Sequence, residues 1–384
     1  MSDTSRTRSA ANAAATFAVV TGGGTSGHVL PALAVADALV ADGVEATEVH
    51  YVGCERGIET RLVPETPYPR TFFDVVGFQR SLTRRNLGFV PKMLRARRAA
   101  VTLLRELRPA VVVSVGGYAS MPAVFAAKKL GIPIVVVSYD RRPGRASRLA
   151  ARSAVACAVA FDNSPLPRAR MTGAPVRQAV LDVDRETDRA AARDRLGIPN
   201  DRFFVAVMGG SLGSGVLNDA IAEYLTAHRE DVGLAVRQVA GERFATSVAP
   251  VGDGSSGVVH QVVGYERDMV AIYAGADLLI GRGGASTVHE VAATGTPAIL
   301  VPWAGAADDH QSDNVAWLSE VGAAVLVDEA ACRDGALGVE IERLRGSVDA
   351  RRALADAARQ RGEVHRSGAL ASLIREVALT SRSS

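Results

Sequence analysis

The chain has 384 residues, of which 48% are hydrophobic and 22% are charged, and its formal net charge is +3. These values predict a soluble globular α/β protein with two domains of ordinary size. A membrane-spanning protein is excluded, because no apolar run reaches the roughly 18 residues that a spanning helix needs. The nearly balanced charge and an aromatic content of only 5% argue against nucleic-acid binding.

The first 15 residues are small and polar, so we expect a disordered tail rather than a secretory signal, which needs an apolar segment. Three cysteines, Cys54, Cys157 and Cys332, lie far apart in the sequence. Their spacing suits neither a disulfide framework nor a metal-ligand cluster. This cysteine usage favours a reducing cytoplasm.

The first structural unit combines a short strand, a glycine-rich turn and a helix. Residues 17–20 predict the strand, and a run of glycines from Gly22 to Gly24 precedes an alanine-rich helical stretch. Such a turn offers free backbone N–H groups and a positive helix end to a phosphate. His28 stands at the helix start, where the helix dipole should lower its pKa and keep it neutral. The alternative is a histidine that only bonds its own turn.

A basic segment lies between Asp74 and Glu106 and contains no acidic residue between these two positions. Hydrophobic side chains are interleaved with its basic residues, which are Arg80, Arg84, Arg85, Lys92, Arg95, Arg97, Arg98 and Arg105. Basic heads beside apolar side chains suit the interface of an anionic membrane. A solvated basic helix that covers the first domain explains this composition equally well.

Further elements complete the first half. The predicted strands are residues 48–52, 111–115 and 134–137, with helices near 92–107 and 122–130. The run 111–115 is almost entirely β-branched, as in a parallel strand that is covered on both faces. A turn containing Tyr118 follows this strand at its carboxyl end, where open α/β sheets bind ligands. The pattern pauses between Gly173 and Arg177, which predicts the domain junction there.

The second half repeats the order of strand, turn and helix. Its predicted strands are residues 203–207, 234–239, 258–262, 278–280 and 298–301. A second glycine-rich turn, from Gly209 to Gly215, follows the first of these strands and precedes another helical stretch. A charged, alanine-rich region at about 348–379 is expected to be helical and to pack back across the junction. Two Rossmann-like α/β domains that face each other across a cleft are therefore predicted.

Polar groups that suit a nucleotide sugar gather late in the chain. Ser286 and Thr287 open a helix, and Glu290 lies one turn further on, where a carboxylate can accept both hydroxyls of a ribose. A capping box formed by Thr287 and Glu290 is the alternative. The predicted loop at 302–314 adds further hydrogen-bonding groups: Asp308, Asp309, His310, Gln311 and Asn314. Zinc is not expected there, because no second histidine or cysteine stands at ligand spacing.

Taken in order, these motifs resemble those of the MurG family, from about residue 17 to the C-terminal helix. The features that carry the resemblance are the 22–28 turn followed by Pro31, the turn at 116–118, residues 173–177, the turn at 209–211, Gly283 to Glu290, and the group at 309–314. The resemblance implies a GT-B fold. It implies a membrane-associated acceptor domain at 16–175, a UDP-sugar domain at 176–350 and a helical region at 351–384 that packs back across the junction.

The same resemblance implies an activity. It is the inverting, metal-independent transfer of N-acetylglucosamine from UDP-N-acetylglucosamine to lipid I, undecaprenyl-pyrophosphoryl-MurNAc-pentapeptide, which forms lipid II for peptidoglycan. The partners are then the nucleotide sugar, the undecaprenyl-linked lipid acceptor and an anionic membrane surface, at the cytoplasmic face of the bacterial cell membrane. No cofactor is implied, and the sequence has no Asp-x-Asp pair at a strand end to hold a divalent ion.

The resemblance also implies roles for single residues. Glu290 holds the ribose, and Arg177 neutralises the diphosphate as the sugar leaves. The uracil is contacted by the backbone near Tyr265 and Glu266, and the diphosphate by Ser211 and the second glycine turn. The sugar hydroxyls face His310, Gln311 and Asn314. The acceptor side is lined by Thr25, Gly27, His28 and Tyr118. The basic segment from 78 to 98 becomes the membrane-docking surface.

One segment departs from the family pattern, which is His-Glu-Gln-Asn before a Pro-Gly turn. Here residues 137–140 are Val-Ser-Tyr-Asp, so Asp140 takes the position of the asparagine. The catalytic base is therefore His28 or Asp140. We favour His28, because its place at a helix N-terminus should keep it neutral, whereas Arg141 and Arg142 should weaken Asp140 as a base or pair with it. The alternatives for the chain are a transferase with another lipid or natural-product acceptor and a non-catalytic UDP-sugar-binding protein.

Overall fold

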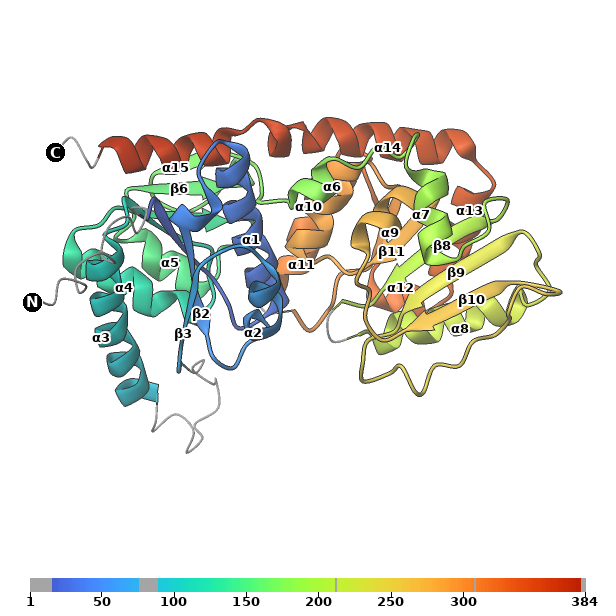
Figure 1. The fold of residues 1–384 in the computed structure, drawn as a ribbon. Helices are drawn as coiled ribbons and strands as arrows, with labels where there is room; N and C mark the ends of the chain where they lie inside the picture. The colour runs from blue at the N-terminus through green and yellow to red at the C-terminus, as the bar shows by residue number, and fades with distance from the viewer. Residues whose placement is uncertain (1–15, 76–88, 211–212, 307–308, 381–384) are drawn as a thin grey trace, which may run out of the picture.

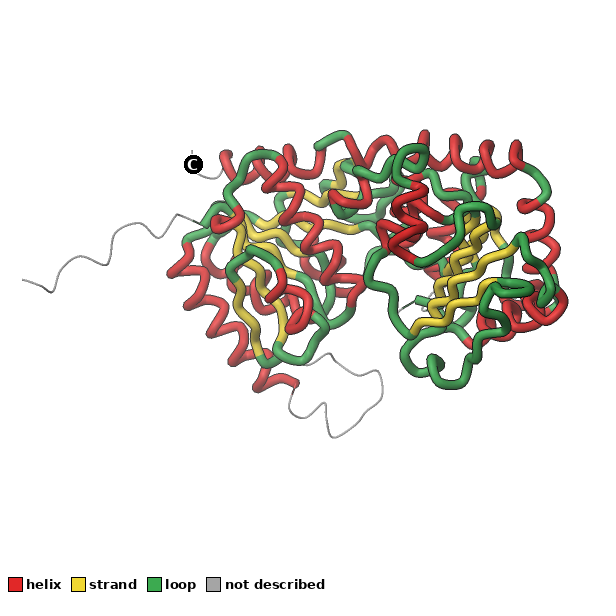
Figure 2. The backbone as a smooth tube through the Cα atoms, turned by 45° about the vertical axis from the view of Figure 1, so that its right-hand side comes forward, coloured by secondary structure: helices red, strands yellow, loops and turns green. Residues whose placement is uncertain are grey.

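The computed structural model describes residues 16–75, 89–210, 213–306 and 309–380. It has two α/β lobes side by side, and the C-terminal helices run along both (Figure 1). Figure 2 shows that each lobe contains one sheet with helices packed around it. The predicted fold class, two Rossmann-like α/β domains, is confirmed. Within these residues no helix is long and apolar enough to cross a membrane.

Both sheets are built from parallel strands. The first sheet contains β1 (Ala18–Thr21), β2 (Val49–Cys54), β3 (Arg70–Phe73), β4 (Val111–Ser114), β5 (Ile134–Ser138), β6 (Ala156–Val159) and β7 (Ala169–Met171). The second contains β8 (Phe203–Met208), β9 (Leu234–Val239), β10 (Val259–Val263), β11 (Leu278–Gly281), β12 (Ala298–Leu300) and β13 (Val325–Leu326). Their spatial orders are β3-β2-β1-β4-β5-β6-β7 and β10-β9-β8-β11-β12-β13.

All nine strands predicted from the sequence are present, with shifts of one or two residues at their ends. Four strands were not predicted, and each has a weak sequence signal. β6 has only one β-branched residue, β7 is an exposed edge strand of three residues, and β13 has two residues. β3 is the opposite edge strand of the first sheet and begins with the exposed Arg70. Edge strands lack the continuous apolar run of a central parallel strand.

The helices of the first lobe are α1 (Ser26–Ala41), α2 (Glu59–Leu62), α3 (Phe89–Leu107), α4 (Met121–Leu130) and α5 (Arg145–Ala151). Those of the second are α6 (Gln178–Leu181), α7 (Arg189–Leu196), α8 (Gly215–Ala227), α9 (Met269–Gly275), α10 (Ala285–Thr294), α11 (His310–Ser319), α12 (Glu329–Arg333) and α13 (Ala336–Arg345). The chain then continues through α14 (Val348–Gly362) and α15 (Ala369–Thr380).

The hydrophobic core links the lobes. One buried cluster packs α3 and α4 on the first sheet, and another packs α8 and α13 on the second. A third cluster runs through both lobes, from Val113 in β4 through Ile374 in α15 and Val291 in α10 to Leu300 in β12. Because this apolar contact is continuous, it holds the two sheets in one arrangement.

The C-terminal helices reinforce this link. α14 packs against α10 in the second lobe, and α15 packs against α1 and β4 in the first. Figure 1 shows both helices, coloured red, lying across the top of the two lobes. The junction predicted near residue 175 falls between Met171, where β7 ends, and Phe203, where the second sheet begins.

Candidate active site

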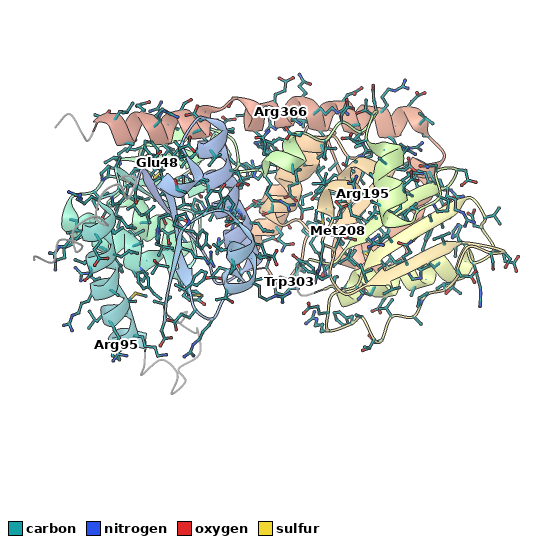
Figure 3. All side chains as sticks on the ribbon, in the orientation of Figure 1. Glu48, Arg95, Arg195, Met208, Trp303 and Arg366 are labelled. Carbon is teal, nitrogen blue, oxygen red and sulfur yellow. The ribbon has the colours of Figure 1, made fainter. Side chains whose placement is uncertain are left out.

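A cavity of about 800 Å³ lies between the lobes. One wall comes from the start of α1 and the segment after β5, and the other from the turn after β8, the start of α10 and the loop after β12. These are carboxyl ends of parallel strands, which is where α/β sheets bind ligands. Trp303 is 49% exposed and lies between the lobes, as Figure 3 shows. We call this cavity the cleft.

A second cavity, of about 290 Å³, extends from the cleft into the first lobe. The two cavities share Thr25, His28, Tyr139 and Asp140. Tyr118 and Arg145 line the smaller one, and Gly27 lines the cleft. The structure therefore brings together the residues that are predicted from the sequence to line the acceptor side. Their roles stay predictions.

The first glycine turn differs from the expectation of free N–H groups. The N–H of Gly24 donates to both carboxylate oxygens of Glu59, at 3.1 and 3.2 Å. Glu59 was not singled out in the sequence, although it is fully buried beside the site. The turn leads into α1 at Thr25, whose carbonyl accepts the N–H of His28 at 3.0 Å.

His28 is held by Tyr139. Its Nδ1 lies 3.2 Å from the Tyr139 hydroxyl, and that hydroxyl donates to the carbonyl of Gly27. Because the hydroxyl hydrogen is directed to Gly27, Nδ1 carries the hydrogen that is shared with Tyr139, and Nε2 is left unprotonated in the neutral ring. Burial lowers the pKa of His28, while the carboxylates of Asp140 and Glu59 act in the opposite direction. The expected direction is confirmed, but burial is the main cause.

Asp140 bridges to the second lobe. Its Oδ1 accepts the Nδ2 of Asn314 at 3.3 Å. The described ion pairs of the neighbouring arginines go elsewhere, from Arg141 to Glu320 at 3.7 Å and from Arg142 to Asp313. Burial raises the pKa of Asp140. The expectation that the arginines weaken this carboxylate as a base is therefore wrong, because burial dominates its environment.

The second glycine turn presents a helix end to the cleft. β8 ends at Met208, and α8 begins after Ser214, whose hydroxyl accepts the N–H of Leu217 at 3.2 Å. Arg282 donates to the same hydroxyl at 2.6 Å and pairs with Glu329 at 2.6 Å. Ser211 lies outside the described residues.

Arg243 also lines the cleft beside this turn. Its guanidinium lies over the Phe244 ring, 4.5 Å from the ring centroid, and donates to the carbonyl of Gly213 at 3.4 Å. No acidic side chain of the described residues pairs with it. Arg243 thus brings positive charge to the turn at which a diphosphate is expected, whereas the charge of Arg282 is balanced by Glu329, which lines the same cleft.

Glu290 and Arg177 meet at the junction of the lobes. Glu290 accepts the Tyr273 hydroxyl at 2.7 Å and pairs with Arg177 at 3.4 Å. Both line a small cavity beside Tyr139 that adjoins the cleft. α10 begins at Ala285 after Gly284, with no side-chain cap, so the alternative of a capping box at Thr287 is wrong. Ser286 and Thr287 line the cleft.

The loop predicted at 302–314 is partly helical, because α11 begins at His310. Gln311 lines the cleft, and its side-chain oxygen accepts the N–H of Trp303 at 2.9 Å. Asn314 is fully buried; its Oδ1 accepts the N–H of Arg141 at 3.0 Å. Its amide therefore joins the two lobes, whereas the family resemblance implies that it faces a sugar.

Two further predicted residues, Tyr265 and Glu266, lie away from the cleft lining. Tyr265 is 42% exposed in the loop after β10, and Glu266 is buried and pairs with Arg237 at 2.6 Å. The Tyr118 hydroxyl lies 3.6 Å from the sulfur of Cys54. Within the described residues, no group of three histidine, cysteine or acidic side chains could hold a metal ion.

Comparisons with known proteins show which family the chain belongs to. The glycosyltransferase family 28 N-terminal domain matches residues 18–159, and the C-terminal domain of the same family matches residues 204–365. The chain is 34% identical over 364 residues to the UDP-N-acetylglucosamine--N-acetylmuramyl-(pentapeptide) pyrophosphoryl-undecaprenol N-acetylglucosamine transferase of Exiguobacterium sp., covering 94% of this chain and 99% of that protein. It is 39% identical over 315 residues to the protein of the same name from Nocardioides sp., covering 81% and 84%.

Solved structures give the same result. The crystal structure of MurG from Acinetobacter baumannii has a TM-score of 0.68 and 25% identity, and the match covers 94% of this chain and 98% of that one. The glycosyltransferase of kitacinnamycin has a TM-score of 0.63 at 16% identity, covering 94% and 98%, which shows a shared fold alone. The two lobes are therefore the two domains of a GT-B fold. The chain belongs to glycosyltransferase family 28 and, within it, to the MurG family.

Proposed function

We propose that the protein transfers N-acetylglucosamine from UDP-N-acetylglucosamine to lipid I and so forms lipid II, with inversion at the anomeric carbon. One observation carries the proposal: His28 and Asp140 of the first domain line the same cleft as the second glycine turn and the start of α10. The printed activity of the relatives supports the choice of both substrates. The nucleotide sugar binds to the second domain and the lipid acceptor to the first.

The reaction needs a base and a stabilised leaving group. The acceptor hydroxyl attacks the anomeric carbon on the face opposite the UDP, and Nε2 of His28 takes its proton. The departing diphosphate is stabilised by the N-terminal ends of α8 and α10 and by the cations at the second turn. The Tyr139 hydroxyl holds the His28 ring in the tautomer that leaves Nε2 available, 3.2 Å from Nδ1.

A second candidate function is transfer to another lipid or natural-product acceptor. The segment after β5 favours it, because Asp140 lines the acceptor-side cavity where the family has an asparagine. A non-catalytic UDP-sugar-binding protein is distinguished from both by the absence of turnover.

We further propose that the protein binds the cytoplasmic face of the bacterial cell membrane through α3. Leu94 is 48% exposed, and Arg95, Arg97 and Arg98 beside it are exposed. Arg95 lies near the end of α3 that points away from the C-terminal helices (Figure 3). Lys92 is engaged within the domain, in an ion pair with Asp74 at 2.8 Å. The part of the basic segment from 76 to 88 lies outside the described residues.

The function is tested by supplying labelled UDP-N-acetylglucosamine with a lipid I analogue, and in parallel with the same lipid carrying other sugars. We expect label on the muramyl acceptor, in the β-configuration, and none on the other lipids. Label on a different acceptor alone would establish the second candidate. UDP-sugar binding without any turnover would overturn both.

Glu290→Ala is expected to raise the KM for UDP-N-acetylglucosamine about tenfold or more, because the ribose hydroxyls lose a charge-assisted acceptor. Tyr273→Phe is the matched control, since it removes the hydroxyl that bonds Glu290 and leaves the carboxylate in place. Steady-state kinetics measure both variants. An unchanged KM in a folded Glu290→Ala protein would show that Glu290 does not bind the ribose.

His28→Ala is expected to lower kcat by roughly 10²–10⁴ with little change in the KM for the UDP sugar. Because burial lowers the pKa of His28, wild-type activity should fall only at a pH below that at which an ordinary histidine gains its proton. Asp140→Asn should retain activity, and His228→Ala in the second domain serves as a control. A fully active His28→Ala enzyme, or an inactive Asp140→Asn enzyme, would show that a group other than His28 acts as the base.

Membrane binding is tested with vesicles that contain anionic lipids. The double variant Arg95→Glu, Arg98→Glu should bind at least about thirtyfold more weakly, since each basic residue contributes about 1 kcal/mol. The control Arg229→Glu, Arg352→Glu makes the same charge change on the second domain and should bind like the wild type. Equal binding by all three proteins would show that α3 is only a solvated helix.

A further inference from the structure

Glu59 is a fully buried carboxylate that the proposed reaction does not use. Its Oε1 accepts the N–H of Cys54 at 2.9 Å and the N–H of Gly24 at 3.1 Å, and its Oε2 accepts the same Gly24 N–H at 3.2 Å. No cation of the described residues forms an ion pair with it. Backbone groups from two different segments therefore compensate for burying this carboxylate.

Three glycines leave the space that the carboxylate fills. A Cβ atom on Gly57 would lie 1.8 Å from Glu59 Oε2, and one on Gly23 would lie 2.3 Å from Oε1. A Cβ on Gly53 would lie 3.0 Å from Glu59 Cγ. These glycines come from the first glycine turn, from β2 and from the segment after β2. The local sequence is therefore adapted to place this one side chain against the turn.

The same packing extends to His28. The turn that Glu59 holds continues directly into α1, where the Thr25 carbonyl accepts the His28 N–H. On the opposite side, a Cβ on Gly117 would lie 2.4 Å from the Gly23 carbonyl and 2.9 Å from His28 Cδ2. The turn and the His28 ring thus both pack against Gly117. A displacement of the turn must therefore move the ring.

We infer that Glu59 is a positioning residue of the acceptor site, which holds the first glycine turn from behind and so fixes His28 for proton transfer. The inference rests on the proposed function. In this inference the first glycine turn does not bind a phosphate, because the Gly24 N–H already donates to the carboxylate of Glu59. The second glycine turn differs, because cationic side chains, Arg243 and Arg282, lie beside it.

The charge of Glu59 can be tested independently through the pKa of His28. His28 faces the Tyr139 hydroxyl and two carboxylates, those of Asp140 and Glu59, both of which raise its pKa against the effect of burial. Arg145 lines the same cavity. Removing the charge of Glu59 without changing its shape should therefore lower the pKa of His28 further. A residue whose charge does not reach the His28 ring would not produce this shift.

The test compares Glu59→Gln with the matched control Glu65→Gln, which makes the same change at an exposed position six residues later. Glu59→Gln should lower kcat between about tenfold and a hundredfold, as expected when a base is slightly misplaced. The KM for UDP-N-acetylglucosamine should stay within about twofold of the wild-type value. The acid limb of the pH profile should move to lower pH, and Glu65→Gln should match the wild type.

The pKa of His28 is also measured directly by NMR of the labelled histidines, with His28→Gln used to assign the signal. Glu59→Gln should lower this pKa whether or not the protein transfers sugar to lipid I. Failure of the proposed function would show as a wild-type protein without turnover. Failure of the inference would show as an active wild type whose kcat and His28 pKa are unaffected by Glu59→Gln.

A further variant covers the case in which Glu59→Gln does not fold. Gly57→Ala keeps the charge but puts a methyl group into the space of the carboxylate. It should lower kcat and leave UDP binding, measured by calorimetry, unchanged. Wild-type kcat in Gly57→Ala, or a parallel loss of UDP affinity in both variants, would overturn the positioning role.

Discussion

Hydrogen bonds between the segment after β5 and the second domain determine the geometry of the whole site. His289 donates to the carbonyl of Tyr139 at 2.9 Å, and Asn314 bonds both Asp140 and the N–H of Arg141. Burial lowers the pKa of His289 to about 4, so this ring is neutral and the bond is independent of pH in the physiological range. Because Tyr139 in turn holds His28, second-domain side chains set the position of the proposed base in the first domain.

Three carboxylates in and beside the cleft have different roles, according to what surrounds each of them. Glu59 accepts backbone N–H groups, and Glu290 is shared between a tyrosine and an arginine. Asp140 has an amide as its neighbour, and burial raises its pKa. The same functional group thus serves as a backbone support, as a predicted ribose acceptor and as a contact between domains. Environment, rather than residue type, separates the roles.

The fold could be predicted where the signal is local. The β-branched run at β4 and the glycine turns after β1 and β8 marked the centres of both sheets and therefore the cleft. The site was predictable only in part. Asn314 contacts residues 173 and 174 positions away, so the sequence around it suggests an exposed polar loop. Glu59 could not be predicted, because the only sign of its role is three glycines that are separated in the sequence. These glycines come together around its carboxylate only when β2 pairs with β1.

The path of the C-terminal helices has a consequence for the order of synthesis. The first sheet is complete once Met171 has been made, yet α15, which covers α1 and β4, follows the entire second domain. During synthesis on the ribosome, part of the apolar surface of the first domain therefore stays uncovered. This state lasts while about two hundred further residues are added, at roughly 5–20 residues per second. That surface, which includes the contacts of Leu373 and Ile374, stays in contact with water until the last helix has been made.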